Sequence, residues 1–167
     1  MITQLNCLVV EDDPVDFQIL EHHLRQAAPG GHCHQVERLA DFQAALAQGG
    51  WDVVLSDYKV PGLDLQETLA CLQANYPELP LILVSGTIGE ERAVEMLKLG
   101  VTDVVLKNNL RRLIPAIERS LHDAAGRRAR LAAEERYRSL FDNMLNGFAW
   151  CRMPIYSIRS RPAHHPW

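Results

Sequence analysis

Four short apolar runs, separated by amphipathic stretches, constrain most strongly what this chain of 167 residues can fold into. The runs are continuous rather than alternating, which is typical of strands buried on both faces of a parallel sheet that helices cover. The sequence therefore predicts an α/β fold with a doubly wound parallel sheet and right-handed crossovers. The runs lie at residues 5–10, 51–57, 79–86 and 102–107, and a weaker fifth strand is expected at 34–38.

A helix is expected after each strand, at residues 14–28, 39–50, 63–76 and 90–100, with Pro14 in a first turn and glycine or proline at the ends. The last helix begins near Leu110 and carries a heptad-like seam that Arg128 weakens. We expect this helix to continue beyond the domain. The alternative is a helix that ends near Gly126, followed by a disordered basic tail. The seam positions are Leu110, Ile114, Ile117, Leu121, Ala124, Arg128 and Leu131.

Charge divides the chain into an acidic front and a basic back. Residues 1–109 carry 6 Lys and Arg against 16 Asp and Glu, a net charge of −10, whereas residues 110–167 carry 11 against 5, a net charge of +6. This asymmetry suggests two functional parts. The basic stretch 127–138 has no second recognition helix, and Glu134 and Glu135 interrupt it, so we interpret it as a solvated signalling helix rather than a nucleic-acid-binding element.

The cysteine pattern and the hydropathy indicate a cytoplasmic protein that does not enter a membrane. The four cysteines are scattered without a CxxC pair, no signal peptide heads the chain, and no apolar run approaches the roughly 18 residues that span a bilayer. The stretch GHCHQ, residues 31–35, contains candidate zinc ligands. No second pair of ligands follows it, so we interpret it as a loop or the entry to a strand.

Charged and hydroxyl side chains gather where the predicted strands end. The carboxyl ends of parallel strands meet at one edge of the sheet, where ligands bind, so these side chains are expected to converge. Neighbouring carboxylates repel unless a cation joins them, and a few hard oxygen ligands with room for water suit Mg²⁺. A metal beside a spare carboxylate and an ammonium is a site for a phosphoryl group, with Asp57 as the nucleophile. The strand-end residues are Glu11, Asp12, Asp13, Asp57, Ser85 and Lys107.

Four motifs, in order and each at a strand end, resemble the response-regulator receiver domain, the phosphoacceptor module of two-component signalling. The resemblance covers roughly residues 4–125. VVEDDP resembles the family's acidic pair, with Glu11 and Asp12 in the paired positions, and LSDYKVPG resembles its phosphoacceptor loop, with Asp57 as the phosphorylated residue. LVSGT resembles the segment that carries the switch hydroxyl, here Ser85, and VVLK resembles the strand end that carries the lysine, here Lys107.

The resemblance implies a five-stranded flavodoxin-like sheet in the order 2-1-3-4-5. It implies that Mg²⁺ is held by Asp12, Asp57, the backbone carbonyl of Lys59 and waters, with Glu11 acting through water. Asp57 would accept a phosphoryl group from a histidine kinase, a phosphotransfer protein or a small phosphodonor, and Lys107 and Ser85 would contact its oxygens. The module would not be an enzyme acting on external substrates. Its output would be a population shift on the face formed by the fourth helix, fifth strand and fifth helix.

Two positions depart from the family pattern. The aromatic residue that the family usually carries three positions before the lysine is Val104 here, which puts the aromatic rotamer switch in doubt. Asn108 follows the lysine where the family often has proline, so the sequence leaves the cis or trans state of this peptide bond open. Asp13, directly before Pro14, is interpreted as a solvated or helix-capping acid rather than a metal ligand.

The back of the chain resembles the start of a second domain. Residues 134–153 resemble the helical lead-in and first strand of a PAS sensor domain, but too few residues follow for a complete PAS fold. We expect a truncated chain with a receiver domain at 4–125, a helical linker at 126–143 and a PAS-like fragment with a disordered tail at 144–167. The signalling helix could pair two copies of the chain into a homodimer.

Three other functions remain open at this point. A pseudo-receiver would use the same surface for interaction without phosphorylation, although Asp57, Ser85 and Lys107 are all present. A small metal-dependent phosphohydrolase would need a second acid two residues after Asp57, where this chain has Lys59. A DNA-binding regulator would need an output domain that this sequence does not contain.

Overall fold

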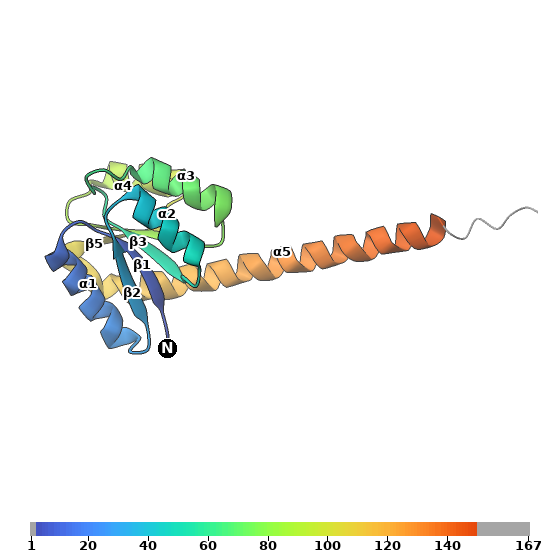
Figure 1. The fold of residues 1–167 in the computed structure, drawn as a ribbon, viewed down its shortest axis with the longest axis horizontal. Coiled ribbons are helices and arrows are strands. Elements are labelled where there is room, and N and C mark those ends of the chain that lie inside the picture. Colours follow the sequence, from blue (N-terminus) through green and yellow to red (C-terminus); the bar gives the residue numbers. More distant parts are fainter. Residues whose placement is uncertain (1–2, 150–167) are drawn as a thin grey trace, which may run out of the picture. The chain divides into compact units, whose positions relative to one another are not determined.

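The computed structural model describes the backbone of residues 3–149 and the side chains of residues 3–141. Five strands form one parallel sheet in the order β2-β1-β3-β4-β5 (Figure 1), which confirms the predicted α/β class, the doubly wound sheet and the flavodoxin-like strand order. The strands are β1 (Asn6–Val10), β2 (His32–Val36), β3 (Val53–Ser56), β4 (Leu81–Ser85) and β5 (Asp103–Leu106).

The buried strands explain the continuous apolar runs. Every residue of β3 and β4 is buried, and so is β1 after Asn6, because each of these strands has a neighbour on both sides and helices on both faces. The edge strand β2 differs, since exposed and half-buried residues alternate along it until Val36. The strand predicted at 34–38 exists, but it begins and ends two residues earlier, because pairing with β1 aligns His32 with Asn6 and Val36 with Val10.

The helices begin and end at the expected signals. They are α1 (Pro14–Ala27), α2 (Leu39–Gln48), α3 (Leu65–Asn75) and α4 (Glu90–Leu99). Asp13 caps α1, because its Oδ1 accepts hydrogen bonds from the backbone N–H groups of Val15 at 2.8 Å and Asp16 at 3.4 Å. The interpretation of Asp13 as a helix cap is confirmed. Gly100 ends α4 with a φ of +113°, a conformation that side chains with a Cβ adopt rarely.

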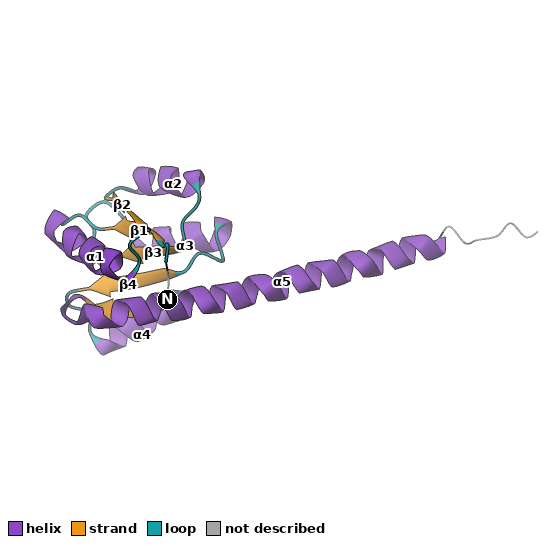
Figure 2. Cartoon of the chain, turned by 90° about the horizontal axis from the view of Figure 1, so that it is seen from below, coloured by secondary structure: helices purple, strands orange, loops and turns teal. Residues whose placement is uncertain are grey.

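Two apolar layers fix the helices to the sheet. One face of the sheet packs against α2, α3 and α4, through residues such as Phe42, Leu69 and Met96. The other face packs against α1 and the beginning of the last helix, through Leu20 and Ile117. Figure 1 shows the strands between these two layers of helices, and Figure 2 shows the sheet from below, from the side of α1 and the beginning of α5. This arrangement leaves the carboxyl ends of the strands free of covering helices, so polar side chains can gather there.

The last helix is longer than a receiver-sized domain needs. After a 3₁₀ segment, η1 (Lys107–Arg112), helix α5 runs over Leu113–Ala149 without a break at Gly126. The alternative of a helix that ends near Gly126 is therefore wrong. Every peptide bond in the described residues is trans, including that between Lys107 and Asn108.

The front half of the predicted seam serves the chain's own core. Leu110, Ile117 and Ala124 are at most 8% exposed, and Leu110 and Ile117 pack in the core layer against the sheet, so these positions are covered within the chain itself. The chain divides into two compact units between Ala129 and Arg130. In the second unit, the described side chains are exposed, with Leu131, Tyr137, Leu140 and Phe141 between 50% and 75% exposed.

The PAS-like fragment predicted at 144–167 is described only in part. Its backbone continues α5 to Ala149, and residues 150–167 lie outside the described residues. No helix in the described part of the chain combines the length and apolar character required to cross a membrane.

The two halves of α5 should differ sharply in their contribution to stability. Ile117→Ala should lower the free energy of unfolding by about 2–5 kcal/mol, because Ile117 is fully buried and its truncation leaves a cavity under the sheet. Leu131→Ala is the matched control, since Leu131 is 50% exposed and its loss should change the free energy by about 0.5 kcal/mol or less. Urea denaturation measures both, and equal effects would contradict this assignment of α5.

Candidate phosphoryl and metal site

The site begins where two neighbouring strands end. Glu11 directly follows β1 and Asp57 directly follows β3, and the two strands pair in parallel. The backbone N–H of Asp57 donates to the carbonyl of Val10 at 2.9 Å, and the backbone N–H of Glu11 donates to Val36 at 3.2 Å. The sheet's own hydrogen bonds therefore continue one residue past the strands and fix the backbones of both acids at one edge.

Three carboxylates meet at this edge. One oxygen each from Glu11, Asp12 and Asp57 lies within 4.8 Å of the others, and no other group of three candidate metal ligands occurs among the described residues. Burial decreases across the group, since Glu11 is 1% exposed, Asp57 is half-buried and Asp12 is exposed. The cluster is thus closed to solvent at Glu11 and open to solvent at Asp12.

Lys107, which directly follows β5, binds this cluster at the same edge of the sheet. Its ammonium donates to Glu11 Oε2 at 2.7 Å, to Asp57 Oδ2 at 2.9 Å and to Asp16 Oδ2 at 2.6 Å. An ammonium has three N–H donors, and each one has a carboxylate partner here. The second oxygens of two of these acids also have partners, because Glu11 Oε1 accepts from the N–H of Asp13 at 3.1 Å and Asp57 Oδ1 from the N–H of Tyr58 at 2.6 Å.

The cluster shifts the protonation equilibria of its buried members. Burial raises the pKa of Glu11 above its ordinary value, and the hydrogen bond from Lys107 opposes part of this rise. Burial alone would lower the pKa of Lys107, but its hydrogen bonds to Asp16, Glu11 and Asp57 together raise it well above the ordinary range. Lys107 is therefore a fixed positive charge at every physiological pH.

The donor set fits a hard divalent cation. The carboxylates of Glu11, Asp16 and Asp57 share a single ammonium, and Asp12 adds a fourth carboxylate beside Glu11 and Asp57, so the site carries an excess of negative charge. Carboxylate oxygens that converge from one side and leave room for water are the ligands that Mg²⁺ prefers. The chemistry of the residues present therefore agrees with the predicted magnesium site.

The other predicted residues lie at the expected strand ends. Ser85 is the last residue of β4 and is 3% exposed, and among the described residues no hydrogen bond joins its hydroxyl to the cluster. Lys59 follows Asp57 by two residues, and the role of its backbone carbonyl stays a prediction.

The stretch GHCHQ lies at the start of β2, which confirms its interpretation as the entry to a strand, and His32 and His34 stack against Trp51.

One member of the site was missed by the sequence reasoning. Asp16 lies in the first turn of α1 rather than at a strand end, so the rule that places functional side chains after strands did not find it. An acid in a first helical turn is common because it interacts favourably with the helix dipole, which hides any other role. The available signal was its position three residues after Asp13, one turn away from the acidic run.

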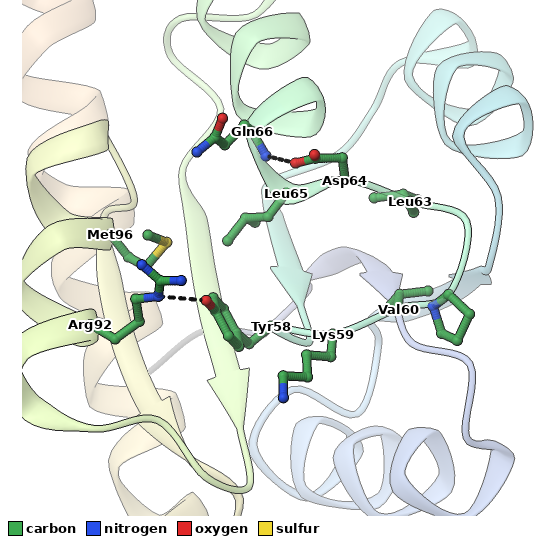
Figure 3. Close-up of a pocket in the computed structure, with 10 residues that line it drawn as sticks. Tyr58, Lys59, Val60, Leu63, Asp64, Leu65, Gln66, Arg92 and Met96 are labelled. Carbon is green, nitrogen blue, oxygen red and sulfur yellow. Dashed lines mark hydrogen bonds between the residues drawn. The ribbon is translucent and has the colours of Figure 1, made fainter.

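A pocket of about 540 Å³ lies beside the site, between the loop that follows Asp57 and helix α4. Figure 3 shows Tyr58 on one side of this pocket, with its hydroxyl accepting a hydrogen bond from Arg92 Nε at 2.7 Å. Arg92 also pairs with Glu95 at 2.8 Å. The residue next to Asp57 is thus tied to α4, while the pocket itself contains no member of the acidic cluster.

Comparisons with known proteins place the chain in one family. The family model of the response regulator receiver domain matches residues 7–118. The response regulator protein FleR of Pseudomonas aeruginosa is 31% identical over 125 residues, which are 73% of this chain and 24% of FleR. The DNA-binding transcriptional regulator NtrC of Escherichia coli K12 is 33% identical over 99 residues, 59% of this chain and 21% of NtrC. The chain thus spans about a quarter of these relatives' length or less.

Solved structures give the same result for the fold. NtrX from Brucella abortus superposes with a TM-score of 0.70 at 25% identity, covering 80% of this chain and 31% of that one. The beryllofluoride-activated NtrC4 receiver domain dimer superposes with a TM-score of 0.64 at 20% identity, covering 71% of this chain and 98% of that one. The second likeness shows the fold alone.

Burial of Glu11 predicts a specific pH dependence of stability. The folded state holds the Glu11 proton more tightly than the unfolded chain does, so the free energy of unfolding should fall as the pH rises from the ordinary value of 4.5 through the raised folded pKa. Glu11→Gln removes this fall. In chelator, urea denaturation from pH 4 to 7 should therefore show the variant gaining stability relative to the wild type as the pH rises. A relative loss would contradict the prediction.

Proposed function

The chain belongs to the response regulator receiver domain family, and on that premise we propose that Asp57 is its phosphoacceptor. The observation that carries this proposal is the contact of the Asp57 carboxylate with both the Lys107 ammonium and the acidic cluster. An acid that ends a buried strand is costly without partners, and Asp57 has partners that suit phosphoryl chemistry. The module is a phosphoacceptor rather than an enzyme that turns over external substrates.

In the proposed reaction, a carboxylate oxygen of Asp57 attacks the phosphorus of the donor. An O–P bond forms to give an acyl phosphate, the bond from phosphorus to the donor breaks, and the donor leaves with the electron pair. Lys107 then donates N–H hydrogen bonds to phosphoryl oxygens, and the Ser85 hydroxyl donates to another. A Mg²⁺ ion held by Asp12, Asp57 and the Lys59 carbonyl, with Glu11 through water, would neutralise charge on the phosphoryl oxygens.

We propose a histidine kinase or a phosphotransfer protein as the natural donor, with small acyl phosphates as substitutes in the test tube. A cytoplasmic location suits the free thiols at Cys7, Cys33 and Cys71. The names of NtrC and its relatives describe DNA-binding regulators, but the residues that match this chain amount to about a fifth of NtrC. DNA binding is therefore not part of the function proposed for this chain.

The proposed output surface is the face of α4, β5 and α5. Large apolar side chains are exposed on it, with Leu97 and Leu99 44% and Leu106 38% exposed. An ion pair joins Arg119 of α5 to Asp103 of β5 across the same face. Because Val104 replaces the family's aromatic residue and packs against the core, the population shift would operate without an aromatic rotamer change.

The proposed domain division follows the sequence expectations, with a receiver domain at 4–125, a helical linker at 126–143 and a PAS-like fragment at 144–167. Pairing of two chains through the second half of α5 would bury the exposed Leu131, Tyr137, Leu140 and Phe141. Phosphorylation on the receiver would then bias this pairing through the continuous helix.

Intact-mass spectrometry after incubation with acetyl phosphate tests the proposed function. The wild type should gain a single phosphoryl group in the presence of Mg²⁺ and none in chelator. Asp57→Asn is the matched control and should gain none in either condition, because the amide is not a nucleophile of this kind.

An adduct that persists in Asp57→Asn would contradict the assignment of the acceptor. The absence of any adduct, with acetyl phosphate and with purified histidine kinases, would instead favour a pseudo-receiver that acts as an interaction module.

A further inference from the structure

Asp16 makes the shortest of the three contacts to the Lys107 ammonium. The distance from Lys107 Nζ to Asp16 Oδ2 is 2.6 Å, compared with 2.7 Å to Glu11 and 2.9 Å to Asp57. The Lys107 side chain is 18% exposed and that of Asp16 36%, so this contact is partly shielded from water. A charge-assisted hydrogen bond of this length in a shielded position is among the stronger polar contacts a protein forms.

The backbone of Asp16 is held by contacts that do not involve Lys107. Asp16 lies in the first turn of α1, and its N–H donates to the capping carboxylate of Asp13. Asp13 also binds the N–H of Val15, so two hydrogen bonds fix the turn that carries Asp16. Helix α1 packs on the sheet through the buried Leu20 and Leu24. Asp16 therefore approaches Lys107 from a rigid element.

Asp16 also differs from Glu11 and Asp57, the other two partners of Lys107, in that it lies outside the group of acids that could share a cation. Glu11 and Asp57 both belong to the group of converging acids that could share a cation, and Asp16 does not. A cation and a phosphoryl group would draw the Glu11 and Asp57 carboxylates into new contacts. Asp16 is then the one partner of Lys107 whose contact need not change during the reaction.

We propose that Asp16 is a positioning residue for phosphoryl transfer. It anchors the Lys107 ammonium, so that the two N–H donors that now contact Glu11 and Asp57 stay beside Asp57 and are in place for the incoming phosphoryl oxygens. This inference rests on the proposed phosphoacceptor function. One N–H of Lys107 stays on Asp16, and the N–H that now contacts Asp57 Oδ2 is left to follow the phosphoryl group. Preorganising a donor in this way speeds a reaction because the donor needs no rearrangement in the transition state.

Charge alone would produce a different effect, and the chain offers a matched control for it. Replacing Asp16 by Asn removes one negative charge from the site, which by itself favours the approach of an anionic phosphodonor. Asp13→Asn removes the same charge three residues away, with the same change of side chain. Asp13 does not contact Lys107, and asparagine caps helices as well as aspartate does, so this control keeps α1 intact.

Phosphorylation kinetics with acetyl phosphate and Mg²⁺ test the inference. In Asp16→Asn, the rate constant at saturating donor should fall by about tenfold or more. This is the factor expected when the charge-assisted hydrogen bond from Lys107 to the phosphoryl group is lost from the transition state. Asp13→Asn should keep the wild-type rate constant, and both variants should share any change in KM that the lost charge causes. Asp16→Glu should recover part of the rate, because it restores a carboxylate on the same turn.

A spectroscopic measurement reports on the anchor directly. The chain contains only Lys59, Lys98 and Lys107, so ¹⁵N-lysine labelling gives a simple spectrum of side-chain ammonium groups. The ammonium of Lys107 should give a slowly exchanging signal in the wild type and in Asp13→Asn. In Asp16→Asn this signal should weaken or vanish, while circular dichroism shows that the fold is retained.

The outcomes separate the inference from the proposed function. A wild type that accepts no phosphoryl group would overturn the proposed function and the role of Asp16 with it. A wild type that is phosphorylated while Asp16→Asn and Asp13→Asn behave alike would overturn only the role of Asp16. A loss of stability in Asp16→Asn without a fall in the rate constant would likewise overturn it, since the contact would then be structural alone.

Discussion

The ammonium of Lys107 joins the end of β5 to three acids that are far from it in sequence. Its partners Glu11, Asp16 and Asp57 lie 96, 91 and 50 residues away, on the ends of β1 and β3 and on the first turn of α1. Each contact is possible only once the sheet has the order β2-β1-β3-β4-β5, which brings the end of β5 to the same edge. The site is therefore a consequence of the topology, and it forms only in the folded state.

This arrangement leaves the folded protein with an electrostatic imbalance. Glu11 is almost completely buried, and Lys107 compensates its lost hydration only in part, as the raised pKa of Glu11 indicates. The partial exposure of Asp57 and the exposure of Asp12 keep the remaining negative charge accessible from solvent. A site with excess negative charge and an open side is poorly suited to stabilising the fold but well suited to binding a cation.

Local patterns predicted the buried parts of the fold. Continuous apolar runs identified β1, β3 and β4 because strands buried on both faces leave no room for polar side chains. A continuous run also identified β5, although this edge strand is fully buried only at Val105. The expected position of the edge strand β2 was two residues too late in the sequence. Exposed and half-buried residues alternate along this strand, and its pairing with β1 sets its bounds. The helix that carries the seam was interpreted as one that could pair two copies of the chain, whereas Ile117 in the front half of the seam packs on the sheet. Periodicity identifies an apolar face but does not identify what covers it.

The candidate site was predicted to the extent that its members follow strands. Glu11, Asp57 and Lys107 do so, and the structure brings them together. Asp16 does not, because its contact with Lys107 depends on how α1 packs against the sheet, which the sequence does not encode locally. Similarly, the link from Tyr58 to Arg92 joins a loop to α4 and follows from tertiary packing alone.

The central claim is that the edge cluster is a binding site for a divalent cation that supports phosphorylation of Asp57. Isothermal titration of the chelator-treated protein with Mg²⁺ tests it most directly, with Asp12→Asn and Asp13→Asn as a matched pair. The account predicts that the wild type binds a single Mg²⁺ and that Asp12→Asn weakens binding roughly tenfold or more, while Asp13→Asn has little effect. Absence of binding in the wild type, or equal effects of the two substitutions, would contradict it.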